Sequence, residues 1–74
     1  KYDLPEATLV TIKIFDILGK EVVSLVDNMH QNAGYKSMRW NGLNKNGKQV
    51  VSGMYFFAIK AGEFKQTRKM ILMK

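Results

Sequence analysis

The 74-residue chain contains no cysteine and only one histidine, one proline and one tryptophan. Without cysteine it can form no disulfide and has no thiolate to act as a nucleophile or metal ligand. Its single histidine, His30, lies in a polar segment, so a surface imidazole is favoured over a general base or a ligand. The longest apolar run, residues 54–59, is far shorter than the roughly 20 residues that cross a bilayer as a helix. We therefore expect no bound metal, no cofactor and no membrane span.

The other candidate catalytic groups are also too few. Ser24, Ser37 and Ser52 fall in expected strands or at a strand start, and none has the flanking glycines of a nucleophile elbow. Asp16 and Glu21 flank an expected hairpin, but a carboxylate pair needs a substrate cleft that one thin domain rarely supplies. We therefore predict no catalytic residues and no enzyme activity.

The composition is that of a small folded domain. Hydrophobic residues make up 46% of the chain and charged residues 24%, close to globular averages. At this size folding buries only about 60% of the surface that the unfolded chain exposes. We interpret residues 1–74 as a single module with a thin core, monomeric in isolation.

Charge is unevenly distributed along the chain. Residues 1–35 carry three Lys and five Asp or Glu (3 − 5 = −2), and residues 36–74 carry nine Lys or Arg and one Glu (9 − 1 = +8). One interpretation is a solvated, lysine-rich strand surface that hinders edge-to-edge aggregation. The alternative is a surface for a polyanion such as an acidic polysaccharide, formed by Lys13, Lys36, Arg39, Lys60, Lys65, Arg68, Lys69 and Lys74. Few exposed aromatic residues are expected between these charges, so nucleic acid is not the expected partner.

Apolar residues in the first half recur at a spacing of two, which is typical of strands. Val10, Ile12 and Ile14 alternate with other residues before Asp16 and Gly19, a pattern that predicts a strand and a hairpin turn braced by the Asp16 carboxylate. Residues 21–27 predict the return strand. Their apolar residues do not alternate cleanly, which indicates a bulge or burial of both faces.

The second half continues this pattern. We expect a polar loop over residues 28–34, a strand over 35–40, an Asn/Gly-rich turn region containing Asn46-Gly47, a short strand over 49–51, an aromatic central strand over 54–60 and a last segment over 64–73. The side chains predicted to be mostly buried are Ile12, Ile14, Leu25, Met38, Trp40, Tyr55, Phe57, Ile59, Met70 and Leu72.

Strands at this spacing, without a helical period, predict an all-β immunoglobulin-like or fibronectin III-like antiparallel β-sandwich of about seven strands. Residues 2–5 look like the end of a strand that begins earlier, so we expect the module to be cut from a larger protein. Residues with an expected structural role in turns or packing are Asp16, Gly19, Trp40, Gly42, Gly47, Gly53 and Tyr55. Asn41, Asn44 and Asn46 are neutral, which disfavours a Ca²⁺ site in their turn.

The order of these motifs resembles the type A C-terminal sorting domains of the type IX (Por) secretion system of Bacteroidetes and related bacteria. It is also similar to the Ig-like domain of the flagellar hook-capping protein. The segments that carry the resemblance are residues 2–6, 14–22, 34–35, 40–42, Asn44 with Gly47, 52–57 and 67–72. The family usually has Trp-Asp-Gly and a further Asp where this chain has Trp40-Asn41-Gly42 and Asn44.

The resemblance implies a sorting and attachment module at the end of an exported protein. Its implied partners are the outer-membrane secretion machinery and the upstream domains, and its implied location is the medium or cell surface of a Gram-negative bacterium, reached through the periplasm. The residues implied in recognition are Lys65, Arg68, Lys69, Met70, Ile71, Leu72, Met73 and Lys74. An accessory Ig-like spacer beside a catalytic domain is a further alternative.

Overall fold

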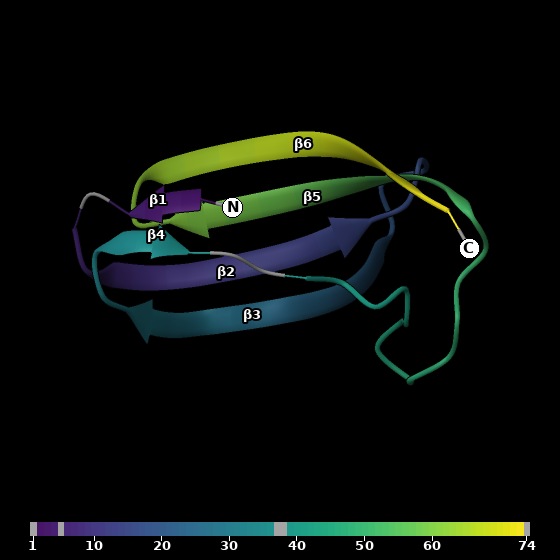
Figure 1. The fold of residues 1–74 in the computed structure, drawn as a ribbon, viewed down its shortest axis with the longest axis horizontal. Helices are drawn as coiled ribbons and strands as arrows, with labels where there is room; N and C mark the ends of the chain where they lie inside the picture. Colours follow the sequence, from purple (N-terminus) through teal and green to yellow (C-terminus); the bar gives the residue numbers. More distant parts are fainter. Residues whose placement is uncertain (1, 5, 37–38, 74) are drawn as a thin grey trace.

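The described residues form six strands, each antiparallel to its neighbours (Figure 1). The computed structural model describes residues 2–4, 6–36 and 39–73. The strands are β1 (Tyr2–Leu4), β2 (Thr8–Phe15), β3 (Glu21–Gln31), β4 (Gly34–Lys36), β5 (Gly53–Ala61) and β6 (Phe64–Leu72). The expected all-β antiparallel class is therefore confirmed.

The strands make two sheets. The larger has the order β3-β2-β5-β6, so β2 is paired on both sides and β6 lies at an edge. β1 and β4 form a two-stranded sheet that lies in front of the larger one in Figure 1. The seven-strand arrangement is thus not reproduced by the described residues, which form six strands in two sheets of unequal size.

The core lies on the face of the large sheet that β1 approaches, here called the inner face. Val10, Ile12 and Ile14 are fully buried, as expected when every second residue of a strand points to the same side. Cα pairing places Ala61, Ile59 and Phe57 of β5 directly opposite them, on the same face. The largest buried cluster consists of Leu4, Val10, Ile12, Val26, Ile59 and Ala61, so β1 supplies part of the core through Leu4.

The prediction of a loop over residues 28–34 is wrong for its first half, because β3 continues to Gln31. Residues 29–31 pair with residues 8–10 of β2, so ladder hydrogen bonds outweigh the polar composition of the segment. The pairing is irregular, as the sequence indicated, with register shifts on either side of Ile12. Asn28 takes a positive φ of 50°, and its N–H donates to Thr11 Oγ1 at 3.0 Å.

Two further strand predictions are also wrong. The expected strand over residues 35–40 is reduced to β4, which ends at Lys36, and Arg39 and Trp40 lie outside any strand. In place of a strand over 49–51 there is one isolated bridge between Gln49 and Leu43. Turn-type hydrogen bonds replace the ladder here, including one from the Val50 N–H to the Gly42 carbonyl at 2.9 Å.

Fewer of the predicted core residues are fully buried than the sequence analysis expected. Ile12, Ile14, Tyr55 and Ile59 are buried, whereas Leu25, Trp40, Phe57, Met70 and Leu72 are half-buried, and Met38 lies outside the described residues. The small second sheet explains the half-buried residues, because it cannot cover the whole inner face. Sequence reasoning also omitted four buried residues, namely Leu4, Val10, Val26 and Ala61.

Replacing Ile12 with Ala is expected to lower the free energy of unfolding by about 2–5 kcal/mol, because it opens a cavity at a fully buried position. Ile17→Ala is the matched control, since the Ile17 side chain is 67% exposed, and it should cost about 0.5 kcal/mol or less. Urea denaturation measures both. Similar losses for the two variants would show that the core is misplaced.

Candidate functional site

The last strand, β6, is one of the two edge strands of the large sheet; β3 is the other. β6 pairs with β5 along its whole length, from Phe64 opposite Ala61 to Leu72 opposite Gly53. Its second edge faces no other strand in the described part of the chain. Such an edge presents free N–H and C=O groups to which an extended segment can add.

Alternation divides the residues of β6 between the two faces of the sheet. Met70 pairs with Tyr55, which is buried on the inner face, and Met70 and Leu72 are half-buried. Ile71 and Met73 are 67% and 83% exposed. The predicted recognition residues are therefore not one surface: Lys65, Lys69 and Ile71 occupy the outer face, Arg68, Met70 and Leu72 the inner face, and Lys74 lies outside the described residues.

The outward-facing residues Lys65, Lys69 and Ile71 of β6, here called the outward stripe, have neighbours on the same face of β5. Ile71 lies opposite Met54, and Lys69 lies opposite Phe56. Phe56 in turn pairs with Phe15 of β2, so two half-buried aromatic residues sit side by side on the outer face. Sequence reasoning left these two aromatics unassigned, and only the register of three strands locates them together.

A basic hollow of about 220 Å³ occupies the other half of the outer face. Its lining includes Lys13, Lys60 and Lys65, with Ala58 between them. Lys60 and Lys65 are direct cross-strand partners, an arrangement of like charges that destabilises a sheet. Lys13 forms a salt bridge with Glu21, at 3.1 Å between Nζ and Oε1. The proposed eight-residue basic patch is thus divided, because Arg39 lies in a loop and Arg68 on the inner face.

Two turns with the same hydrogen bonds lie close together at the end of the sheet where β2 ends. Asp16 Oδ1 accepts the N–H groups of Leu18 and Lys20, each at 2.9 Å. Asn44 Oδ1 accepts those of Asn46 and Lys48, at 2.9 and 3.0 Å. Gly19 and Gly47 occupy the same place in each turn, with φ values of 83° and 80°, which glycine adopts without strain.

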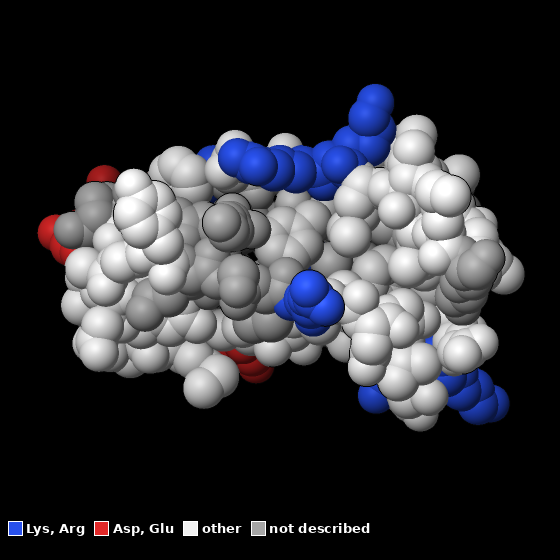
Figure 2. All heavy atoms as spheres, in the orientation of Figure 1, with Lys and Arg blue, Asp and Glu red and all other residues white. Residues whose placement is uncertain are grey.

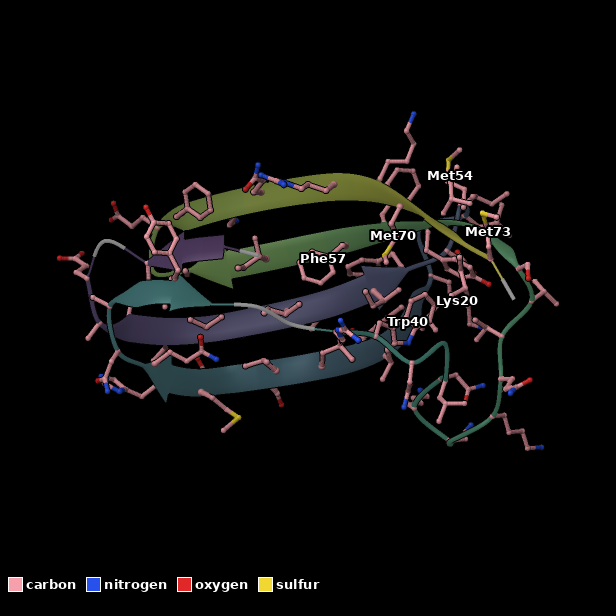
Figure 3. All side chains as sticks on the ribbon, viewed as in Figure 1. Lys20, Trp40, Met54, Phe57, Met70 and Met73 are labelled. Atoms are coloured by element: carbon pink, nitrogen blue, oxygen red, sulfur yellow. The ribbon has the colours of Figure 1, made fainter. Side chains whose placement is uncertain are left out.

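The segment between β4 and β5 is attached to the inner face by two aromatic residues. The rings of Trp40 and Tyr55 meet edge to face with centroids 5.0 Å apart. The Trp40 indole N–H donates to the Leu43 carbonyl at 2.9 Å, and the Tyr55 hydroxyl donates to the Val51 carbonyl at 2.6 Å. Met70 is the cross-strand partner of Tyr55, and Figure 3 draws Trp40 over the same half of the sheet as Met70. Buried Gly42 and the first residue of β5, Gly53, lie at the two ends of the turn region.

The titratable residues singled out from the sequence lie in separate parts of the fold. Within the described residues no group of three or more His, Asp or Glu side chains could hold a metal ion. His30 is exposed on β3, opposite Leu9. A hollow of about 310 Å³ beside Asp16 and Glu21 also contacts Asn44, but Asp16 Oδ1 already accepts two backbone N–H groups. Within the described residues, no helix is long and apolar enough to span a membrane.

Comparison with known families gives one match. A family model described as the FlgD Ig-like domain matches residues 1–63. That range ends before Phe64, the first residue of β6. Neither the curated proteins nor the solved structures gave a significant match.

The two similar turns allow an internal test. Asp16→Ala and Asn44→Ala should each cost about 1–2 kcal/mol, because each removes the acceptor of two backbone N–H groups. Asp16→Asn should cost about 0.5 kcal/mol or less, since Asn44 makes the same two bonds with an amide oxygen. Thermal and urea unfolding measure these costs. A large loss for Asp16→Asn would mean that the negative charge, and not the turn geometry, is what the fold requires.

Proposed function

Since the FlgD Ig-like domain model matches most of its length, the chain belongs to the FlgD Ig-like domain family, and we propose that it is a non-catalytic sorting and attachment module. In this proposal the type IX secretion machinery of a Gram-negative bacterium recognises the module. The protein that carries it is then exported through the periplasm to the medium or the cell surface.

The observation that supports this proposal is the position of β6. It is an edge strand, and its outer face carries Lys65, Lys69 and exposed Ile71, followed by exposed Met73. A partner can therefore reach both the side chains of this stripe and the backbone of the edge.

Recognition through β6 would combine two kinds of contact. Strand addition supplies backbone hydrogen bonds with little sequence preference, and alternate side chains supply the specificity. Lys69 and Ile71 face the same way, so a partner surface with an acidic group beside an apolar pocket would contact both. Met70 and Leu72 pack toward the inner face. They can hold β6 in register with β5 while the partner contacts the outer side of β6.

The proposal also concerns the longer protein of which this module would be a part. We expect upstream domains to carry its activity, with residues 1–74 as the C-terminal module. We also propose that the complete module is a seven-strand Ig-like sandwich, which requires one strand more than the six that the described residues form.

Binding of an acidic polysaccharide is a second candidate function. It is supported by the direct opposition of Lys60 and Lys65 beside Lys13 on the outer face. Salt-sensitive retention on an acidic polysaccharide, lowered by Lys60→Gln with Lys65→Gln, would favour this function. An inert spacer would show neither this retention nor the export effects described next.

The test of sorting uses a reporter fused to residues 1–74 in a host with the type IX machinery. Lys69→Ala, Ile71→Ser and deletion of residues 71–74 should each reduce export of the reporter, because they remove a charge, an apolar contact and the end of the stripe. We expect at least a severalfold loss for the deletion, measured as reporter in the medium or at the cell surface.

Matched controls lie elsewhere on the sheet. Lys60→Ala removes another exposed lysine, and Met29→Ser removes an apolar side chain that is 58% exposed on β3. Both should export at the parental level, and circular dichroism of each purified module checks that it folds. If all three β6 variants fold and are exported like the parent, β6 is not the signal.

A further inference from the structure

Exposed apolar residues collect at the end of the molecule that holds the C-terminus. Leu18, at 88% exposed, and Ile17 lie in the turn between β2 and β3. The start of β5 and the end of β6 reach the same end, as Figure 1 shows. Figure 3 shows Met54 and Met73 there, close to each other. The six exposed apolar residues of this apolar tip are Ile17, Leu18, Val51, Met54, Ile71 and Met73.

Lysines accompany the apolar tip. Lys20 follows the exposed turn directly, and Lys69 lies on the outer face two residues before Ile71. Lys45 and Lys48 belong to the neighbouring Asn44 turn, and all four lysines are exposed. Two acidic groups lie nearby and are outnumbered by these lysines: Asp16, whose Oδ1 accepts two backbone N–H groups, and Glu21, which pairs with Lys13.

The opposite end carries acidic residues instead. Exposed Leu9, Met29 and Phe64 lie there, but Glu6 and Glu63 line the hollow beside Phe64. On the face drawn in Figure 2, red acidic atoms occupy the left end and the lower edge, and none is visible at the right end. Apolar exposure alone therefore does not distinguish the two ends, whereas the balance of acidic and basic groups does.

We propose that the apolar tip docks on an anionic lipid bilayer, with Ile17 and Leu18 inserted among the acyl chains and the lysines at headgroup level. Polybasic residues beside apolar side chains are the combination that anionic bilayers bind. Lysine stems can lie along apolar surface while their ammonium groups stay in the interface. The opposite end carries Glu6 and Glu63 as well as Lys60 and Lys65, so it lacks the lysine excess of the apolar tip, and this difference sets the orientation.

Most backbone N–H groups of the turn are paired within it, which lowers the cost of bringing the turn into the interface. Its N–H groups at Asp16, Leu18, Gly19 and Lys20 all donate within the turn, to Asp16 or to the Lys20 carbonyl. Unpaired backbone groups are what makes insertion of irregular chain costly.

The composition of the apolar tip fits a bilayer as well as the protein partner proposed for β6. The apolar tip consists of Ile, Leu, Val and Met, and the cations around it are lysines. A bilayer requires no matching pocket for side chains of this kind.

The test is co-sedimentation of the 74-residue chain with vesicles of phosphatidylcholine alone or mixed with phosphatidylglycerol. Binding is expected only to the anionic vesicles and should weaken as salt is raised. Ile17→Ser with Leu18→Ser should weaken it by roughly tenfold or more, because the inserted apolar surface is lost. Lys20→Gln with Lys48→Gln should weaken it by roughly fivefold per charge.

Matched controls replace residues at the opposite end. Leu9→Ser with Met29→Ser should leave vesicle binding within about twofold of the parent, and Lys60→Gln with Lys65→Gln should reduce it less than the Lys20 and Lys48 pair does. Absence of binding to anionic vesicles, or equal losses in tip and control variants, would overturn the proposal. None of these substitutions lies in the exposed part of β6 from Lys69 to Met73, so the result is independent of the sorting proposal.

A label provides a second readout. The chain has no cysteine, so Leu18→Cys gives a single site for an environment-sensitive fluorophore. Its emission should shift to the blue on anionic vesicles, whereas the same label at Leu9→Cys should not shift. A label at position 18 that stays in water while the chain is vesicle-bound would contradict insertion.

Discussion

The edge-to-face contact between Trp40 and Tyr55 is the interaction on which the covered half of the sheet depends. The turn region before β5 has one isolated bridge in place of a strand ladder. Tyr55 belongs to β5, and Trp40 follows the short strand β4. Their contact, with one side-chain hydrogen bond from each ring system, fixes the turn region against the inner face. A further bond, from the Lys45 N–H to the Val22 carbonyl at 3.1 Å, ties it to β3.

A chain this short cannot cover both faces of a four-stranded sheet. The inner face has Leu4 of β1 at one end and the Trp40 region at the other. The outer face keeps Phe15 and Phe56 half-buried among lysines. Surface that a larger domain would bury is therefore available for partners, and the proposed sorting stripe and lipid-binding tip both use it.

Period-two alternation was sufficient to predict β2, because every second residue from Val10 to Ile14 is apolar and buried. β5 and β6 were predicted as well, although the inner face of β6 carries Gln66 and Arg68 beside half-buried Met70 and Leu72. Alternation failed where hydrogen bonding, rather than burial, determines the strand. Asn28, His30 and Gln31 are polar, yet pairing of residues 29–31 with β2 keeps this segment in β3. Trp40 was recognised as an aromatic residue that packs on the sheet, but its indole partner, the Leu43 carbonyl, depends on the turn geometry. The residues of β6 in the candidate site could be listed from the sequence. Their neighbours Met54 and Phe56 could be identified only from the pairing register of β5 with β6.

Hydrogen exchange measured by NMR tests most directly whether Trp40 and Tyr55 hold the turn region in place. Protection should be found at the Trp40 indole N–H and at the amides of Asn44, Lys45 and Val50, which donate to Leu43, Lys48, Val22 and Gly42 respectively. Replacing Tyr55 with Leu should remove that protection while the amides of β2 stay protected. Exchange of these four groups at the rate of an unfolded chain in the parent protein, with β2 protected, would contradict the account.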